Sequence, residues 1–444
     1  MGNVLGHGPI DYIVVYSLMA YAVYAGFTKP HRILFILPAC LSFFFFIEVG
    51  PRLTPDKLVP AVFVIATVAN KGIGYYKNSV KNQFWIITVL VMVLFSTVIG
   101  SFYSNYYSSY LTSSIVGTRL IIQVIGYLNY MLIFIIVRKE CTLQLGVKWL
   151  LKSFLITTSI LCLYGVYQFY ANKFGWPYRG IVYTDKTSGF GGFNNNEELI
   201  FRVNSLANEP KRLTYFIMIG ILIILKYYKS IKNRIGFFPL IIVLIFHFVV
   251  LWLTYSTSIY FVLAVFIMLL LLYSIFRSYN GRIIRFIFLF GFLGIVAFTN
   301  EGEYLNQIYD IRVDGQLESN IIRSEVYGQE FMVNNLGMFV IGLGPGVYNL
   351  ALAKEYPGKA GILNNGTFLV PFNSDLLIFI YDFGIIGFFI LFIPFINIAM
   401  DRKIAANRFS IYIIFMYCVS IALSGTATLF FLLGAFEAEK NRML

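Results

Sequence analysis

Long apolar runs recur along almost the whole chain, and they restrict the protein to folds that span a membrane. A bilayer crossing takes about 20 apolar residues in a helix, and about twelve runs come close to that length or reach it. The third run is short, and the last is long and interrupted at Ser424 and Gly425. The sequence therefore predicts an all-α, polytopic transmembrane helical bundle with spans near residues 10–27, 33–50, 56–70, 84–103, 115–137, 150–170, 213–228, 236–254, 256–275, 282–298, 375–398 and 409–433.

The composition excludes a water-soluble enzyme. Of the 444 residues, 59% are hydrophobic and only 12% are charged, whereas a soluble chain carries about 25% charged residues. The three histidines and four cysteines are too few and too scattered for a zinc or di-iron site or a disulfide framework. We find no internal repeat and no soluble domain. The sequence thus predicts a single polytopic membrane domain over residues 1–444, with no metal and no cofactor.

The net charge of +13 is distributed in a way that predicts orientation. If the connections are numbered alternately, one set of short loops holds most of the lysines and arginines. The other set, apart from two long loops, holds only Arg52, Lys57, Lys440 and Arg442. The positive-inside rule places the first set in the cytoplasm. The basic charge therefore reflects membrane topology and not nucleic-acid binding. The amino terminus and the long loops 171–212 and 299–374 are expected outside.

The first long loop ends in a pattern suited to an anion. Glu209 and Pro210 read as a helix start, with an acidic group at the positive end of the helix dipole. Arg202 and Arg212 do not fit this explanation, because cations near a helix amino terminus are unfavourable. A bound anion would offset that effect. On residue types alone, a solvated loop with aromatic side chains at the membrane interface is an equally good interpretation.

The second long loop contains Arg323, the turn from Gly342 through Gly344 to Gly346, and then Asn373 and Asp375 at the start of the next span. Glycines allow a backbone to approach a ligand closely. A tight bend after a short helix explains the three glycines equally simply, and for the glycines alone we favour it.

Inside the apolar runs, Arg119 and Asp382 are the notable charges. An ionisable group at membrane depth is by default a functional-site hypothesis. If Arg119 is functional, we expect its side chain to line a cavity inside the bundle. The alternative is that the side chain extends outward to the membrane interface. His247, alone on an aromatic helix, is expected to be a packing residue.

The order of these motifs resembles the O-antigen polymerase and O-antigen ligase superfamily of bacterial membrane glycosyltransferases. The resemblance covers about residues 150 to 400. It rests on a large outer loop leading into Arg202, Glu209 and Pro210, and on Arg323 and the Gly342–Gly346 turn. It also rests on Leu253-Thr254-Tyr255-Ser256-Thr257-Ser258, Asn373-Ser374 and Asp382-Phe-Gly-Ile-Ile-Gly387.

The resemblance implies a GT-C-like glycosyltransferase of lipopolysaccharide and polysaccharide biosynthesis in the bacterial inner membrane. Such enzymes act on sugars linked to undecaprenyl pyrophosphate at the periplasmic face. The ligase branch typically has a His-Asn pair where this chain has Phe372-Asn373. This departure and the Glu209-Pro210 pair favour the polymerase branch. A chain-length regulator and a flippase are the partners that the resemblance implies.

We therefore expect a metal-independent polymerase that joins lipid-linked oligosaccharide repeat units. Arg202, Arg212 and Arg323, with Arg119, are the candidates for binding pyrophosphate, because guanidinium groups bind phosphate in forks. Glu209 is the first candidate for the general base and Asp375 the second. Two alternatives stay open: a ligase that transfers polysaccharide to lipid A core, and a flippase or other transporter, for which matching halves and charges at the midplane are expected.

Overall fold

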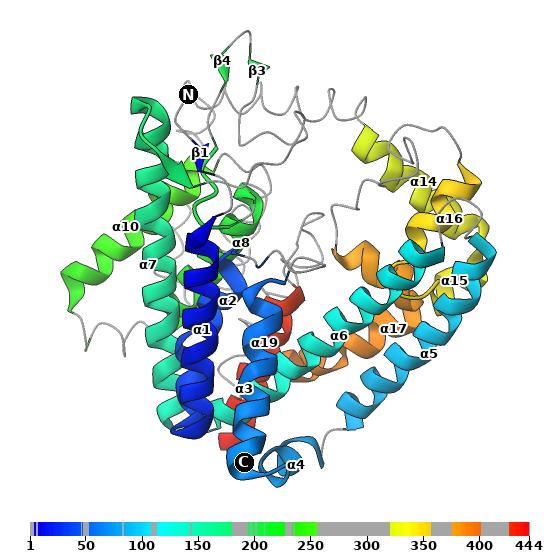
Figure 1. Ribbon diagram of the computed structural model, residues 1–444, viewed down its shortest axis with the longest axis horizontal. Coiled ribbons are helices and arrows are strands. Elements are labelled where there is room, and N and C mark those ends of the chain that lie inside the picture. The colour runs from blue at the N-terminus through cyan, green and yellow to red at the C-terminus, as the bar shows by residue number, and fades with distance from the viewer. Residues whose placement is uncertain are drawn as a thin grey trace, which may run out of the picture.

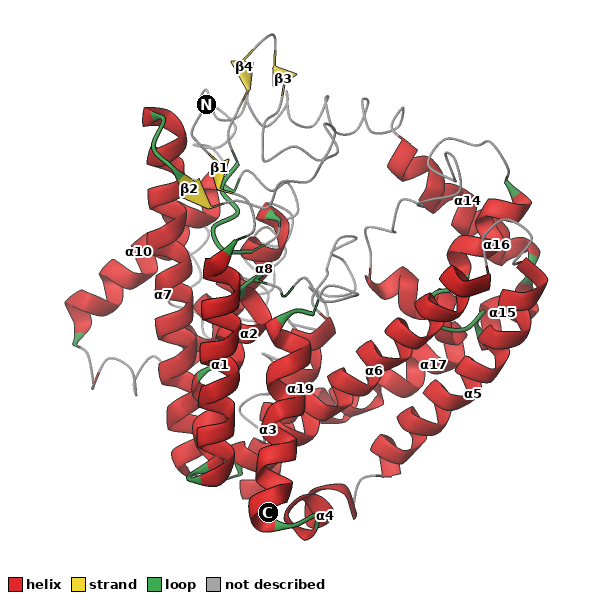
Figure 2. Cartoon of the chain, viewed as in Figure 1, coloured by secondary structure: helices red, strands yellow, loops and turns green. Residues whose placement is uncertain are grey.

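The computed structural model describes residues 4–5, 8–45, 47, 53–81, 84–107, 113–142, 144–179, 194–195, 198–199, 202–207, 209–226, 233, 236–254, 320–356, 375–400 and 426–443. Helices make up most of these residues (Figures 1 and 2). Four of the described helices are long and apolar enough to cross a membrane, over Pro9–Phe27, Trp85–Ser104, Leu120–Cys141 and Lys152–Phe174. Shorter apolar stretches cover Arg212–Ile221, Phe237–Leu253, Leu377–Leu391 and Ala427–Ala438. The prediction of a helical membrane protein is confirmed to that extent.

Eight of the predicted spans coincide with helices of the structure. These are α1 (Pro9–Phe27), α3 (Pro55–Lys71), α5 (Phe84–Tyr107), α6 (Ser113–Cys141), α7 (Gln144–Phe174), α8 (Pro210–Lys226), α10 (Phe237–Leu253) and α17 (Asp375–Met400). Between them lie the short helices α4 (Gly74–Lys81), α14 (Asn320–Asn334), α15 (Leu336–Ile341) and α16 (Tyr348–Glu355). The runs at 256–275 and 282–298 lie outside the described residues.

The second predicted span, at 33–50, is wrong as a single helix. The chain forms a 3₁₀ helix η1 (Pro30–Phe35) and a short helix α2 (Leu37–Ser42), and it continues in extended conformation from Phe43. The peptide N–H of Phe44 donates to the carbonyl of Leu206 at 2.9 Å. Backbone outside a helix needs such partners in an apolar interior. A distant segment supplies this one, so local hydrophobicity alone misassigned the run.

Two of the connections predicted to share one side of the membrane, those after α3 and α6, lie together at one end of the bundle. The ammonium groups of Lys71 and Lys139 both lie within 5 Å of the Tyr75 ring, at 4.9 and 4.8 Å from its centroid. At the opposite end, β1 (Val4–Leu5) pairs in parallel with β2 (Tyr178–Arg179) (Figure 1). A second pair, β3 (Asn194–Asn195) with β4 (Glu198–Leu199), is antiparallel.

The last helix, α19 (Thr426–Met443), corrects the predicted position of the carboxyl-terminal lysine and arginine. α19 runs parallel to α6, since Phe430 stacks on Tyr130 and Gly434 packs against the backbone of Phe134. Its end therefore lies beside the basic end of α6, and Lys440 and Arg442 do not belong to the outer set. α19 begins just after the interruption at Ser424 and Gly425. The two ends of the described chain lie at opposite ends of the bundle (Figure 1).

The core has two main parts. The larger is built mainly of aliphatic and aromatic side chains from α3, α5, α6, α7, α8 and α19, with Phe134, Phe154 and Phe431 among its fully buried residues. The smaller gathers α14, α15 and α16 around Tyr381 of α17, and Figure 1 shows this group apart from α8 and α10. The two predicted outer loops therefore contribute to different regions of the molecule.

Candidate functional site

The segment Arg202–Ala207 is a non-helical loop that is buried in the bundle and leads directly into α8. Val203, Asn204 and Ser205 are each at most 2% exposed. Ser205 has a φ of 52°, which is a left-handed conformation that few residues other than glycine adopt. Non-helical backbone in a membrane protein is tolerated where it is buried in protein, as Val203, Asn204 and Ser205 are here. The predicted outer loop 171–212 therefore ends inside the bundle.

Gln168 of α7 holds this loop in place. Its side-chain oxygen accepts hydrogen bonds from the peptide N–H groups of Asn204 at 3.1 Å and Ser205 at 2.7 Å. Its side-chain nitrogen donates to the amide oxygen of Asn204 at 2.5 Å. Gln168 is fully buried, so each of these bonds satisfies a group that water does not reach. Sequence reasoning missed Gln168, because an isolated glutamine in an apolar helix has no local pattern.

Arg202 lies on the carboxyl-terminal end of α10. Its Nε donates to the carbonyl oxygen of Thr254 at 3.1 Å, and its side chain is half-buried. A cation is favourable at a helix carboxyl terminus, where carbonyl groups carry partial negative charge. This contact changes the prediction made for Arg202, because a protein carbonyl offsets part of the charge that was assigned to an anion.

The start of α8 has the predicted form. The helix begins at Pro210, and the carbonyl of Glu209 accepts the hydrogen bond of the Leu213 N–H at 3.2 Å. The side chain of Glu209 is exposed, Arg212 is half-buried, and Leu213 is fully buried. Glu209 and Arg212 therefore lie at the surface end of a helix whose apolar side enters the core.

An ion pair fixes the beginning of the same outer region. The guanidinium group of Arg179 contacts the carboxylate of Asp11, which is 1% exposed, and it lies 4.3 Å from the centroid of the Phe45 ring. Asp11 also accepts the N–H of Gly8 at 3.1 Å. The amino-terminal helix and the extended segment after α2 thus clamp the chain as it leaves α7. Asp11 was not predicted as a partner.

The second candidate segment is a glycine turn that packs on a break in α17. Gly342, Gly344 and Gly346 all have positive φ angles, and so does Gly384 inside α17. A Cβ atom at Gly384 would lie 2.2 Å from the carbonyl oxygen of Val340, and one at Gly344 would lie 2.3 Å from Cα of Gly100. The turn was predicted as a tight bend after a short helix, and α15 does precede it. The glycines also permit backbone contact with α17 and α5.

Asp382 is the fully buried carboxyl group at this break. Its Oδ2 accepts the hydroxyl of Tyr127 at 2.5 Å, and its Oδ1 accepts the N–H of Gly346 at 3.1 Å. Its carbonyl oxygen accepts the N–H of Gly344 at 3.0 Å and the hydroxyl of Ser96 at 2.5 Å. The carboxyl group is thus occupied by protein donors, and its contacts assign it to holding α5, α6 and the glycine turn together.

The remaining predicted residues are placed less completely. Arg119 belongs to α6, Arg323 to α14 and Asp375 to the first position of α17, and their side chains lie outside the described parts of the structure. Asn373 lies outside the described residues altogether. Figure 1 shows α14 well apart from α8. Convergence of Arg202, Arg212 and Arg323 on one pyrophosphate therefore stays a prediction.

His247 behaves as expected for a packing residue. It is fully buried on α10, and its Nδ1 lies 2.6 Å from the carbonyl oxygen of Val243, one turn earlier. Among the residues that the structure describes, no group of three or more histidine, cysteine, aspartate or glutamate side chains is arranged to hold a metal ion.

Comparison with known proteins identifies no family for this chain. No protein-family model matches the sequence, no curated protein matches it, and no solved structure matches the fold.

Proposed function

We propose that this chain is a metal-independent membrane glycosyltransferase that polymerises oligosaccharide repeat units. The growing glycan leaves undecaprenyl pyrophosphate and is transferred to an incoming lipid-linked repeat unit. The protein is a multi-pass component of the bacterial inner membrane, and its reacting groups face the periplasm. Its bundle is GT-C-like with close to twelve crossings.

The observation that carries the proposal is the buried loop Arg202–Ala207. It is irregular backbone held inside an apolar bundle, and it delivers Glu209 and Arg212 to the surface end of α8. An anionic carboxylate and a guanidinium group presented on a rigid support are suited to a substrate with hydroxyl groups and a phosphate. The order of motifs shared with the O-antigen polymerase superfamily supports the same function.

The proposed chemistry breaks the bond between the anomeric carbon of the donor sugar and the phosphate oxygen. A hydroxyl oxygen of the acceptor sugar forms the new glycosidic bond, and undecaprenyl pyrophosphate leaves with the bonding electrons. Arg202, Arg212 and Arg323 stabilise the negative charge that develops on the leaving group. Glu209, or Asp375 in its place, accepts the proton of the acceptor hydroxyl, which typically accelerates such a step by about 10²–10⁴-fold. No nucleotide sugar is consumed.

The test uses the purified full chain in detergent with lipid-linked repeat units, where no membrane separates donor from acceptor. We expect glycan chain growth, and its loss in Glu209→Gln and Arg212→Ala. Lys77→Ala, which removes an exposed cation at the opposite end of the bundle, is the matched control and keeps wild-type chain lengths. Arg202→Lys accompanies these variants, because Arg202→Ala also removes the contact with Thr254.

Three outcomes contradict the proposal. Absence of growth with a well-folded wild-type protein excludes a polymerase under these conditions. Transfer of glycan to added lipid A core, without growth, identifies a ligase. Movement of the lipid-linked unit across proteoliposomes, without growth, identifies a transporter.

A further inference from the structure

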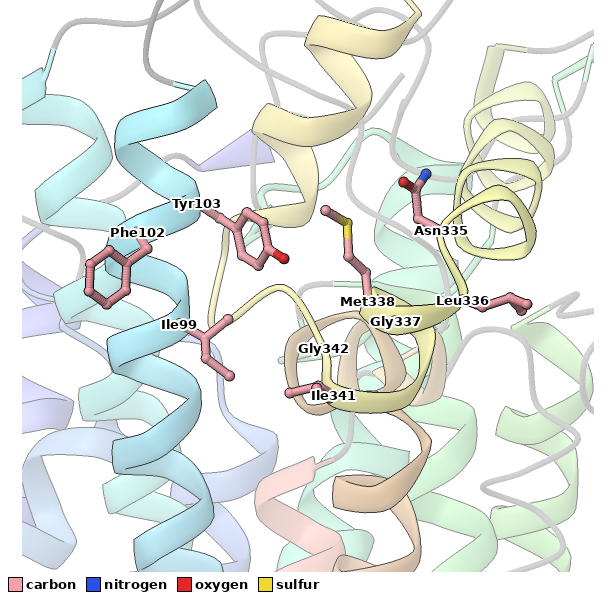
Figure 3. Close-up of a pocket in the computed structure, with 9 residues that line it drawn as sticks. All are labelled: Ile99, Phe102, Tyr103, Asn335, Leu336, Gly337, Met338, Ile341 and Gly342. Carbon is pink, nitrogen blue, oxygen red and sulfur yellow. The ribbon is translucent and has the colours of Figure 1, made fainter.

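A groove separates the outer part of α5 from α15. Its volume is about 570 Å³, and Figure 3 shows Ile99 and Tyr103 of α5 facing Met338 and Ile341 of α15 across it. Asn335 stands at one edge, and Phe102 and Leu336 point away from the space. Sites for small organic molecules typically have volumes of about 300–1,000 Å³ and mostly apolar walls. The groove therefore has the size and the chemistry of a site for an apolar ligand.

The glycine contacts explain why the groove exists in this position. Gly344 packs on Gly100, the residue after Ile99 of the groove wall, which brings the turn and α5 together there. Gly337, on the α15 wall, has nothing within 4 Å of the position that a Cβ atom would occupy. The two walls thus meet along one edge and leave open space beside Gly337.

The groove opens beside a lipid-facing surface. α5 is one of the four described helices that have the length and composition of a membrane span. It exposes Val91, Leu94, Phe95, Val98 and Phe102 at intervals that place them on one face of the helix. Ile99 and Tyr103 lie beside this face, on the side of α5 that is turned toward the groove. A hydrocarbon chain therefore reaches the groove laterally from the bilayer without crossing water.

A cation lies just beyond the groove. The ammonium group of Lys354, on α16, is 3.5 Å from the centroid of the Tyr106 ring, one turn past Tyr103 on α5. Tyr106 and Lys354 form an amphipathic pair of the kind that is found where hydrocarbon meets the head groups. We propose that one acyl chain of an anionic phospholipid occupies the groove and that its phosphate group lies beside Lys354.

The test is photolabelling of the full chain in nanodiscs. The probe is phosphatidylglycerol with a diazirine on one acyl chain, and the labelled peptides are mapped by mass spectrometry. Label is expected on residues 99–103 and 335–341. Gly337→Phe fills the groove and lowers this label by about tenfold, because the added ring competes for the same space. Gly126→Phe is the matched control, since Gly126 of α6 also has nothing within 4 Å of a Cβ position.

Further variants keep the proposal open to refutation. Met338→Trp fills the groove from a second position in case Gly337→Phe does not fold. Lys354→Gln is expected to abolish the preference for labelled phosphatidylglycerol over labelled phosphatidylcholine, without moving the label.

Equal labelling in Gly337→Phe, Gly126→Phe and the wild type overturns the proposal. So does label confined to the Val91–Val98 face, or label obtained from a photoreactive polyprenyl phosphate and not from phosphatidylglycerol. Glycan polymerisation is not needed for any of these measurements, so failure here leaves the proposed function untouched.

Discussion

The hydroxyl group of Tyr127 donates a 2.5 Å hydrogen bond to the carboxyl group of Asp382, across 255 positions of the sequence. The same carboxyl group accepts the N–H of Gly346. Asp382 thereby joins α6, α17 and the glycine turn at a point where α17 is broken at Gly384. A buried carboxyl group with two donors is stable in an apolar interior, whereas loss of a donor leaves it unsatisfied.

Replacement of Tyr127 by phenylalanine tests this contact. Tyr127→Phe keeps the ring, which packs against Phe383 with centroids 4.6 Å apart, and removes only the hydroxyl. We expect the free energy of unfolding to fall by about 1–3 kcal/mol, because a buried acceptor loses its partner. Thermal or denaturant unfolding in detergent measures the change. Tyr16→Phe, at an exposed position of α1, is the control, and an equal effect in both variants would contradict the prediction.

Gly384→Ala tests the break in α17. Gly384 has a φ of 68°, and a Cβ atom there would lie 2.2 Å from the Val340 carbonyl oxygen and 2.6 Å from the Gly342 nitrogen. We expect a loss of about 2–4 kcal/mol, because both backbone strain and overlap with backbone atoms are introduced. Gly126→Ala, inside α6 with open space around it, is expected to stabilise the helix by about 0.5–1 kcal/mol. The decisive result is a lower free energy of unfolding in Gly384→Ala together with a higher one in Gly126→Ala.

Gln168→Leu tests the support of the buried loop. The substitution leaves the N–H groups of Asn204 and Ser205 without their acceptor, and each unsatisfied group costs about 1–3 kcal/mol. We expect limited proteolysis to cut near residues 202–207 at lower protease concentration than in the wild type. Gln123→Leu, at an exposed position of α6, serves as the control. Unchanged cleavage in Gln168→Leu would show that the loop does not depend on this side chain.

A double-mutant cycle tests the clamp between Arg179 and Asp11. Removing the guanidinium group in Arg179→Met leaves the buried carboxylate of Asp11 without its cationic partner, and breaking a buried pair from one side typically costs about 3–5 kcal/mol. Asp11→Asn in the same chain removes that unpaired charge. We therefore expect the double variant to be more stable than Arg179→Met alone. Strict additivity of the two single effects would mean that the ion pair contributes no coupling.

His31 gives the protein a pH dependence of predictable sign. Burial, with the neighbouring cations Arg32, Lys29 and Lys71, lowers the pKa of His31 below its ordinary value of 6.5. Below pH 6.5, His31 is therefore protonated less often in the folded state than in the unfolded state. The free energy of unfolding falls as the pH falls from 6.5 to the lowered pKa. The loss is small, because His31 is only partly buried and solvent screens the neighbouring cations. Unfolding temperatures at pH 7.5, 6.5 and 5.5 measure it. His31→Gln is expected to show a smaller decline, and a parallel decline would assign the effect to other groups.

Much of the secondary structure is predictable from local sequence. The helix start at Pro210 follows from Glu209 and Pro210 themselves, and α5, α6 and α7 follow from continuous apolar runs. The run at 33–50 departs from this rule, because its extended part at Phe44 is bonded to Leu206, a residue far away in the sequence. Apolar composition does not distinguish such a segment from a helix.

The candidate site was predicted in its residue types more than in its contacts. Arg202 was recognised as an unexplained cation, yet its partner is the carbonyl of Thr254, which no spacing rule selects. Asp382 was recognised as an unusual charge, and its tyrosine donor lies on another helix. Gly384 belongs to the motif that carries the resemblance, but its role at the break in α17 depends on the approach of Val340.

The amino-acid sequence by itself determined that this chain is helical and apolar, where most of its described helices lie, and which short connections carry the positive charge. These properties depend on hydrophobicity and charge within about one helix length, so they are legible along the chain. The tertiary structure alone decided that Arg202–Ala207 is buried, that α19 runs parallel to α6, and that Tyr127 meets Asp382. Such outcomes depend on which surfaces pack together. Packing brings together residues that are far apart in the sequence, and no local pattern shows that they will be in contact.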